Sequence, residues 1–288
     1  MDTLHYTDSE LPIYFQTESA DPIGGHSEMA HWHDAIEIVS VERGSLCCLA
    51  GGTEMCLHRG DVCFINRRQL HRVIAEGESD AVRRVLILGP GLLTQNTLVH
   101  EKYIRPLIED RRFSHVRFAG GSSPAAEIGR LMDEIESLLS LRSCGYELEV
   151  IALVHRMFRQ LFCAYSASAE TLPHDGNALL QQKMSEYIYA HYAEPLTLDD
   201  IARAGSVSRS QCIKLFNQYT KQSPIAFLNG HRLEVSRDLL RNSSDSILSV
   251  AQRCGFGEQS YFNRLFLRAY GCTPSRYRRG GLPLALEG

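Results

Sequence analysis

The feature that most restricts the fold of this chain is an internal repeat near its C-terminal end. The first copy spans residues 196–228 (LTLDDIARAGSVSRSQCIKLFNQYTKQSPIAFL), and the second spans residues 246–278 (SILSVAQRCGFGEQSYFNRLFLRAYGCTPSRYR). Matched positions lie 49 residues apart before an inner turn and 50 after it, pairing Ile201-Ala202 with Val250-Ala251, Leu215-Phe216 with Leu265-Phe266, and Pro224 with Pro274. Such a period indicates one supersecondary unit used twice.

Each copy has the features of a helix-turn-helix. Thr197 and Ser208 are suited to cap the two helices of the first copy, because their hydroxyls can accept from free backbone N–H groups. In the second copy, Ser246 can cap and Gly255 can turn. Residues 224–242 predict one long helix that would hold the copies at a fixed separation. The second helices are expected to bury Cys212 or Ile213, Leu215, Phe216 and Tyr219 in the first copy, and Tyr261, Phe262, Leu265 and Phe266 in the second.

The spaced residues of the repeat match a known pattern. The matching positions include Arg232-Leu233, Gly255-Phe256, Ser260-Tyr261-Phe262-x-Arg264-x-Phe266 and Gly271-x-Thr273-Pro274-x-x-Tyr277-Arg278. Over residues 178–279 the chain resembles the AraC/XylS family of bacterial transcription regulators, which implies that promoter DNA is a partner. Ser206 stands where a turn glycine is usual, and Leu267 where a basic residue is usual, so one phosphate contact is expected to be missing. The alternative is an all-α repeat protein that binds no DNA.

The residues expected to face DNA follow from helix geometry and the family motif. They are Arg209, Ser210, Ile213 and Lys214 on the first recognition helix, and Gln259, Ser260, Asn263 and Arg264 on the second. A helix in the major groove reads base edges, which offer a distinguishable pattern of donors and acceptors. Gln259, Asn263 and Arg264 suit paired hydrogen bonds to bases, whereas the basic residues of the first helix suit either bases or phosphates. For each residue the alternative is an ordinary solvated helix face.

Charge divides the chain in the same way as the repeat does. The net charge of −4 combines 14 Lys and Arg against 9 Asp and Glu in residues 178–288 with 16 against 25 in residues 1–177. A basic segment beside an acidic one fits a nucleic-acid-facing module attached to one that avoids nucleic acid. Residues 1–16 do not resemble a signal peptide, and no apolar run is long enough to span a membrane. Nine cysteines, an odd number, favour a reducing cytoplasm over a disulfide framework.

Residues 1–95 predict a small β domain. Short strands are expected at 37–41, 46–49, 54–57, 62–65 and 83–88, with a hairpin turn at Gly51-Gly52. Many short strands between glycine turns are typical of a β-barrel or a double-sheet jelly roll. Four cysteines fall in this region, Cys47, Cys48, Cys56 and Cys63. Their spacing matches no zinc pattern, and we expect them to be small buried residues.

Within this β domain, His31-Trp32-His33-x-x-x-Glu37, followed by Gly60 and then His71, resembles the two signature segments of the cupin superfamily. The resemblance implies a barrel with His31, His33, Glu37 and His71 at the metal-ligand positions. Imidazoles with one carboxylate suit a divalent transition metal, although the sequence requires no cofactor. Asn66 and Arg68 depart from the pattern, where proline and glycine are usual. The alternative is a hydrogen-bonded network that fixes the barrel mouth without metal.

Residues 96–165 predict a helical region that includes a hairpin of two long helices at 127–141 and 147–165. In the regulators that the chain resembles, helices here pair two subunits, which implies a homodimer; simple packing onto the barrel is the alternative. Residues 166–177 (SASAETLPHDGN) have the composition of a linker.

The sequence as a whole predicts an α+β multidomain chain. A cupin-like, jelly-roll β-barrel (1–95) is followed by a helical region (96–165), a linker (166–177) and an all-α DNA-binding domain with two helix-turn-helix units (178–280). The predicted function is a cytoplasmic, homodimeric transcription regulator that senses a small-molecule effector in its barrel, and such a regulator can also contact RNA polymerase. It is not expected to be an enzyme or to bind membranes. Two alternatives remain: a metal-dependent cupin enzyme fused to a DNA-binding tail, and an effector-free regulator whose barrel is a dimer scaffold.

Overall fold

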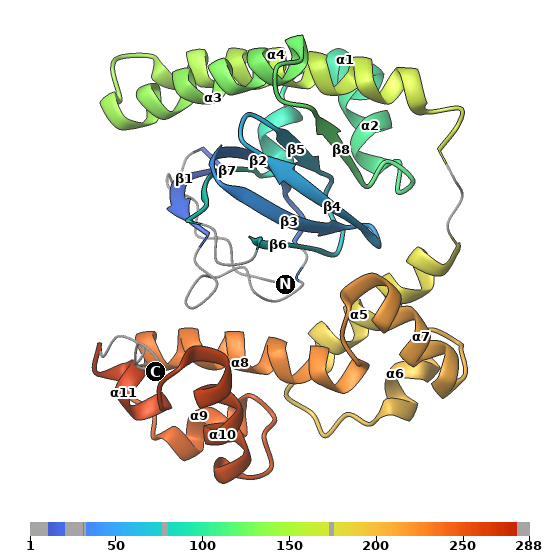
Figure 1. Cartoon of the computed structure of the whole chain (residues 1–288), viewed down its shortest axis with the longest axis vertical. Helices are drawn as coiled ribbons and strands as arrows, with labels where there is room; N and C mark the ends of the chain where they lie inside the picture. Colours follow the sequence, from blue (N-terminus) through green and yellow to red (C-terminus); the bar gives the residue numbers. More distant parts are fainter. Residues whose placement is uncertain (1–10, 21–30, 32, 77–79, 173–175, 281–288) are drawn as a thin grey trace. The chain divides into compact units, whose positions relative to one another are not determined.

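The computed structural model describes residues 11–20, 31, 33–76, 80–172 and 176–280, which form two compact units (Figure 1). The first unit contains the described residues up to 172, and the second contains those from 176 onward. Within these residues, no helix combines the length and the apolar character that crossing a bilayer requires. Trp32 of the histidine motif and residues 173–175 of the expected linker lie outside the described residues.

The strands of the first unit form two antiparallel sheets. A five-stranded sheet has the order β1-β7-β2-β5-β8, and a three-stranded sheet has the order β4-β3-β6. The strand bounds are β1 (Ile13–Ser19), β2 (Ile36–Arg43), β3 (Ser45–Ala50), β4 (Thr53–His58), β5 (Val62–Ile65), β6 (His71–Ala75), β7 (Val82–Leu88) and β8 (His115–Phe118). The predicted double-sheet β domain is therefore present.

Strand β2 is buried on both faces, because successive side chains of a strand point to opposite sides. Ile36 and Ile38 join the core between the five-stranded sheet and the helices. Val39 and Val41 instead join the core between the two sheets. Glu37 is two and four residues from Val39 and Val41, so its side chain points to the same face of the strand. Its carboxylate therefore lies on the side that faces the three-stranded sheet.

Three strands go beyond the sequence prediction. Strands β1 and β6 lie in stretches for which no strand was predicted, and β8 lies inside the region predicted to be helical, which is a correction. Strand β8 pairs with β5, where His115 is opposite Ile65 and Phe118 is opposite Val62. A strand of four residues contains too few alternations for its period to be recognised in the sequence.

A helical layer covers the five-stranded sheet of the first unit (Figure 1). It comprises η1 (Pro90–Leu93), α1 (Thr97–Val99), η2 (His100–Ile104), α2 (Arg105–Glu109), α3 (Ser123–Leu141) and α4 (Tyr146–Ser168). The α3–α4 hairpin confirms the two predicted long helices. Its apolar side packs on the sheet core through residues such as Ile128, Leu131, Val154 and Met157. Packing onto the sheet was one of the two alternatives considered, and it uses most of the apolar surface that suggested a dimer.

The second unit is all-α. Its helices are α5 (Gly176–His191), α6 (Leu198–Ala204), α7 (Arg209–Thr220), α8 (Pro224–Asn242), α9 (Ile247–Arg253), α10 (Gln259–Tyr270) and α11 (Pro274–Arg278). The predicted helix-turn-helix pairs are α6–α7 and α9–α10, joined by the predicted long helix α8. Thr197, Ser208 and Ser246 cap α6, α7 and α9 as expected, each accepting from a backbone N–H three residues on. Because α4 ends at Ser168 and α5 begins at Gly176, the connection is shorter than the predicted linker.

Both inner turns use a left-handed backbone conformation. Ser206 has φ 55° and Gly255 has φ 81°. For an L-residue this conformation costs roughly 1–2 kcal/mol, which explains why glycine is usual at the position of Ser206. At Gly255 the demand is stricter, because a Cβ there would lie 2.5 Å from the carbonyl oxygen of Tyr192.

The structure decides two details of the recognition helices. In the first copy of the repeat, Cys212 is fully buried, whereas Ile213 is 38% exposed. Tyr261, which the repeat predicted to be buried, is 37% exposed, while Phe262 and Phe266 form the buried face of α10. The prediction for Tyr261 was wrong because an aromatic residue next to a buried one was assigned to the same face.

Candidate DNA interface and candidate metal centre

Helix α7 presents the predicted contact residues on one exposed face. Arg209, Ser210, Ile213 and Lys214 are all exposed. The opposite face is anchored by Cys212, Leu215, Phe216 and Tyr219, all of which are buried. Buried residues of this spacing fix the rotation of the helix about its axis, so the exposed face is set by packing rather than by a loop.

Arg209 has an intramolecular partner that the sequence analysis did not predict. Its guanidinium forms a bidentate ion pair with the carboxylate of Asp199 on α6. This hydrogen-bonded pair raises the pKa of Arg209 and lowers the pKa of Asp199. The contact links the two helices of the first helix-turn-helix, and it partly neutralises the charge that Arg209 would offer to a phosphate.

Helix α10 presents the second predicted set less uniformly. Ser260 and Arg264 are exposed, whereas Gln259 and Asn263 are half-buried. The Arg264 guanidinium lies over the ring of Tyr261, 5.4 Å from its centroid. A hollow of about 380 Å³ at the start of the helix is lined by Gly257, Glu258, Ser260, Tyr261 and Arg264.

Tyr261 is a surface residue beside Arg264 that the sequence analysis had assigned to the buried face. Its hydroxyl accepts a hydrogen bond of 3.1 Å from Asn229 Nδ2 of α8. The phenol ring of Tyr261 therefore stacks against the Arg264 guanidinium, and its hydroxyl is fixed by the hydrogen bond from Asn229 of α8. The motif Ser260-Tyr261-Phe262 contained this residue, but only its exposure shows that it belongs to the surface.

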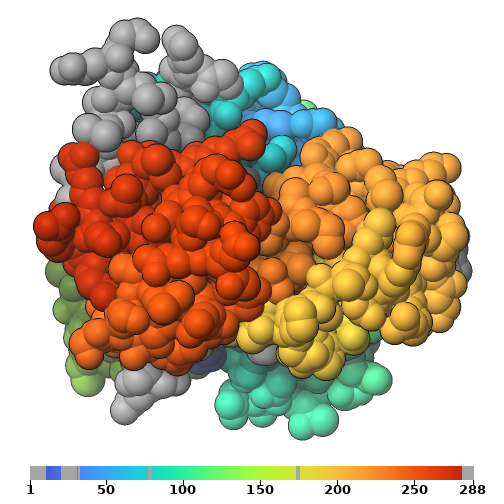
Figure 2. All heavy atoms as spheres, turned by 90° about the horizontal axis from the view of Figure 1, so that it is seen from below, coloured from blue at the N-terminus to red at the C-terminus, as the bar shows by residue number. Residues whose placement is uncertain are grey.

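Helices α7 and α10 belong to one compact unit, in which α8 joins α6–α7 to α9–α11. Figure 2 shows both groups, yellow to orange and red, in one view of the molecule. Arg232 of α8 is 92% buried and donates to the carbonyl oxygens of Tyr192 and Glu194, both at 2.7 Å, in the turn after α5. Its guanidinium also lies 5.7 Å from the ring centroid of Phe256, beside the turn of the second copy. One side chain thus joins the turn between α5 and α6 to the second helix-turn-helix.

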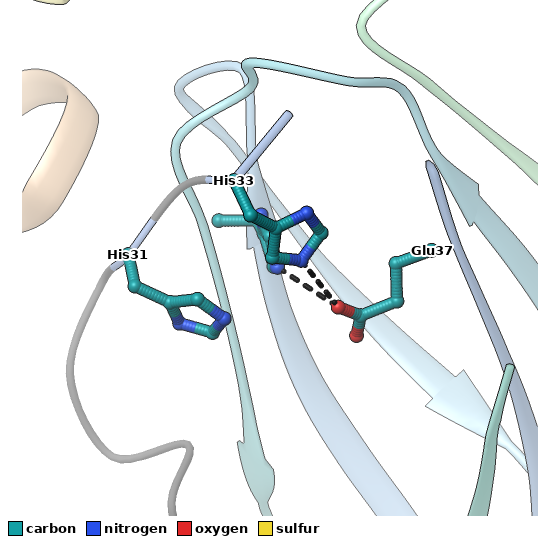
Figure 3. Close-up of side chains that lie close together, drawn as sticks. His31, His33 and Glu37 are labelled. Atoms are coloured by element: carbon teal, nitrogen blue, oxygen red, sulfur yellow. Dashed lines mark hydrogen bonds and ion pairs between the residues drawn. The ribbon is translucent and has the colours of Figure 1, made fainter. Parts of the chain in front are cut away.

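In the first unit, the structure brings the four cupin-like residues together. His31, His33, Glu37 and His71 each offer one ligand atom, and these atoms all lie within 4.8 Å of one another. His31 and His71 are joined by a pair of backbone hydrogen bonds of 2.9 Å, and their ring centroids are 4.4 Å apart. Figure 3 shows the rings of His31 and His33 and the Glu37 carboxylate converging.

The hydrogen bonds of this cluster determine which ring nitrogens are available. Nδ1 of His33 lies 3.0 Å from Ala35 O, and Nδ1 of His71 lies 2.9 Å from Gln69 O. A carbonyl can only accept, so both Nδ1 atoms carry the proton. Nε2 of each ring then faces Glu37 Oε2, at 3.2 and 3.1 Å. With both rings neutral, two Nε2 lone pairs would face the Glu37 carboxylate oxygen, an arrangement that a cation between them would stabilise.

The Glu37 carboxyl is kept in its charged form. Burial alone would raise its pKa, but the imidazoles of His71 and His33 outweigh that effect and hold the pKa well below its usual range. Imidazoles that donate Nδ1–H to a backbone carbonyl and present Nε2 are typical of metal ligands, because the outer bond fixes the tautomer and the ring orientation. The donor set fits a divalent transition metal.

The departures from the second cupin segment are accommodated locally. Asn66 Nδ2 donates to the carbonyl oxygens of Leu107 and Phe113, at 3.0 and 2.9 Å. Arg68 has φ 58°, which explains why glycine is usual at its position. Its Nε donates to the carboxylate of Asp34 at 2.7 Å, an ion pair that glycine could not form.

The cysteines of the β domain are only partly as predicted. Cys48 and Cys63 are buried in the core between the sheets. Cys47 and Cys56 are half-buried, so the prediction was wrong for these two. Strand alternation explains the difference, because both lie on the opposite side of their strands from the inward-facing Leu46 and Leu57.

Comparison with known proteins assigns both units. The AraC-like ligand binding domain matches residues 19–158, and the helix-turn-helix domain matches residues 201–280. The chain belongs to the AraC family. It is an AraC-type, DNA-binding transcription regulator with a ligand-binding domain.

Curated relatives that match this AraC-family chain over most of their length are transcription regulators. It is 26% identical over 275 residues to the uncharacterized HTH-type transcriptional regulator YdeC of Bacillus subtilis (strain 168), covering 94% of this chain and 92% of YdeC. It is 27% identical over 253 residues to the HTH-type transcriptional activator RhaS of Citrobacter koseri, covering 87% of each. These names confirm the interpretation as a regulator rather than an enzyme.

Solved structures show the same fold. ToxT from Vibrio cholerae has a TM-score of 0.52 at 12% identity, covering 93% of this chain and 98% of ToxT. A ToxT structure with a bound unsaturated fatty acid has a TM-score of 0.51 at 13% identity, covering 92% and 94%. At such low identity the likeness establishes the fold alone.

Proposed function

We propose that this regulator reads promoter DNA in a sequence-specific way with α7 and α10, under the control of a small-molecule effector that acts on the first unit. The observation that carries the DNA proposal is the pair of exposed helix faces in one compact unit. Two helices joined by a rigid connector suit two successive major-groove segments, about one helical turn apart.

The contact residues divide by chemistry. Arg264 and Gln259 suit bidentate hydrogen bonds to base edges, and Ile213 suits the methyl group of thymine. Asn263 suits a base contact through its amide nitrogen, because its Oδ1 is buried. Lys214, Ser210 and Ser260 suit phosphate or base contacts at the same surface. Arg209 is the weakest phosphate ligand of the set, because Asp199 already pairs with it.

Binding titrations over a salt series test these assignments. Arg264→Ala should cost about 1–3 kcal/mol on the operator and relax discrimination at one base pair. Arg209→Ala serves as the matched control and should weaken all sequences alike, reducing the salt slope by less than about one because of its intramolecular pair. Operator binding by Arg264→Ala at the strength of the parent would overturn the base-reading role.

Effector sensing is proposed for the first unit, which matches the AraC-like ligand binding domain. Support comes from the polar cluster of His31, His33, Glu37 and His71 within the β domain, and from the fatty acid bound by a protein of the same fold. A thermal-shift screen with small metabolites tests this proposal, since a ligand that binds the native state raises the melting temperature. A regulator whose β domain is only a scaffold would show no shift with any metabolite.

We further propose that this histidine cluster holds one divalent transition metal ion. Support comes from the two Nε2 atoms turned toward one carboxylate oxygen. Elemental analysis of protein purified without a histidine tag and without added metal should find about one ion more per chain in the parent than in His33→Ala. His33→Ala should lose that ion. If the parent carries no metal and a chelator leaves its melting temperature unchanged, the cluster is a protonated hydrogen-bonded network instead.

Two wider features complete the proposal. The chain acts in the cytoplasm, where its nine cysteines can remain the free thiols that the structure shows and where promoter DNA and RNA polymerase are accessible. It pairs as a homodimer through the turn end of the α3–α4 hairpin, where Leu141 of α3 and Leu148 of α4 are 78% and 74% exposed.

A further inference from the structure

We propose that Cys56, His58 and Glu76 form a second metal site, one that binds a zinc-class divalent ion through a thiolate. One ligand atom from each of the three residues lies within 4.8 Å of the other two. The site is separate from the histidine cluster, which offers only nitrogen and oxygen atoms and contains the inward-facing Glu37 of β2.

The three side chains are positioned by the sheet. Cys56 and His58 are two residues apart on β4, so they point to the same face. Glu76 directly follows β6, and its backbone N–H donates to Ser45 O of β3 at 3.0 Å. Ser45 is also the register partner of His58. Strands β4 and β6 lie on opposite sides of β3. An ion bound by these ligands would therefore cross-link the two outer strands of the three-stranded sheet.

A proton now occupies the place that a cation would take. Cys56 Sγ donates to Glu76 Oε2 at 2.7 Å, which raises the pKa of the thiol and lowers the pKa of the carboxyl. Binding of a divalent ion would form a metal–sulfur bond and release this thiol proton to solvent, leaving thiolate and carboxylate on one cation. Asp61 accepts from the backbone N–H of His58 at 2.9 Å and lies 4.0 Å from its Nδ1, so a buried carboxylate stands beside the imidazole.

The donor set selects the class of metal. Sulfur from cysteine, nitrogen from histidine and oxygen from a carboxylate are the ligands of Zn²⁺, and a soft thiolate disfavours Mg²⁺ and Ca²⁺. Three protein ligands leave a fourth tetrahedral position for water or another residue. Cys47 is directly opposite Cys56 in the β3–β4 register, and it donates to Glu54 Oε1 at 3.2 Å.

Cobalt provides a probe that separates this site from the histidine cluster. Reduced, metal-stripped, full-length protein is titrated with Co²⁺ alone while the near-ultraviolet charge-transfer absorption of a cobalt–thiolate bond is recorded. Nitrogen and oxygen ligands do not give this band. We expect the band to saturate at about one thiolate-bound ion per chain and to disappear on addition of Zn²⁺.

Matched variants locate the thiolate. Cys56→Ser should abolish the band, whereas Cys144→Ser, which changes an exposed thiol in the α3–α4 turn, should retain it. His58→Gln and Glu76→Gln should each weaken Co²⁺ binding by at least about tenfold, since even outer-shell partners contribute that much. These side chains are not fully buried, so the metal-free variants should keep the circular dichroism spectrum of the parent. A parent without the band, a band that survives Cys56→Ser, or one that is lost in Cys144→Ser would overturn the proposal.

Discussion

Arg232 offers the sharpest test of how α8 holds the turn after α5 within the all-α unit. Its guanidinium donates to two carbonyl oxygens after α5, and a hydrogen bond from a charged donor contributes about 1.5–3 kcal/mol. Part of this gain offsets the cost of burying the charge, a cost that also lowers the pKa of Arg232. Replacing Arg232 by Met keeps the apolar stem but strands both carbonyls, so we expect a net loss of about 2–4 kcal/mol.

Hydrogen exchange followed by mass spectrometry on the full chain measures this loss where it occurs. Amides of α5 and α8 should exchange about 30- to 1,000-fold faster in Arg232→Met, while amides of the first unit should not change. The matched control is Arg237→Met, because Arg237 is equally buried over the ring of Tyr270 but its Nε has no partner among the described residues. We expect less than about tenfold from the control. An unchanged exchange rate in Arg232→Met, or an equal effect of both variants, would refute the reasoning.

Three further predictions follow from local geometry. Ser206→Gly should stabilise the chain by about 0.5–1 kcal/mol by relieving its φ of 55°, whereas Gly255→Ala should destabilise it by more than about 1 kcal/mol, and thermal melts of both variants check the opposite signs. Burial alone would raise the pKa of Asp61, but hydrogen bonds to its carboxylate outweigh this effect and lower the pKa. The charged carboxylate therefore stabilises the folded state above the ordinary pKa of 3.8, and this stabilisation is lost as the pH falls through the lower pKa of the native state. Asp61→Asn should therefore cost about 1–3 kcal/mol in urea unfolding at neutral pH, a gap that must narrow in acid if the carboxylate is its source. Leu148→Glu should shift sedimenting protein from dimer to monomer, and a parent that is monomeric at tens of micromolar would count against the dimer.

The sequence predicts those parts of the fold that have a clear hydrophobic period or a helix-capping residue. Helix α8 has the predicted bounds, Pro224–Asn242, and Ser246 caps α9 as expected. Strand β8 was missed because four residues carry too little alternation. Tyr261 was misplaced because neighbouring aromatic residues in a helix can face different sides, and only the burial of Phe262 among residues of α8 and α9 distinguishes the two.

The functional sites were predictable in composition but not in their interactions. The cupin-like spacing correctly grouped His31, His33, Glu37 and His71, because strand register brings the two segments together. The tautomers depend on carbonyls that only the folded loops bring to Nδ1, and no spacing rule contains them. The ion pair of Arg209 and the cluster around Cys56 likewise join residues whose separation in the sequence matches no motif.

The central claim is that two rigidly connected helices read two groove segments of one operator, and DNA spacing tests it directly. An operator selected by the full-length protein from random sequence is lengthened between its two recognised segments by half a helical turn, about five base pairs, or by a full turn of about ten. An insertion of half a turn rotates one DNA segment to the opposite face of the duplex. An insertion of a full turn keeps both segments on one face but separates them by more than the distance that α8 sets between α7 and α10. The account predicts that either insertion weakens binding by about 100-fold or more, as expected when one of two tethered modules is disengaged. Binding that stays within about twofold of the parent operator after either insertion would contradict it.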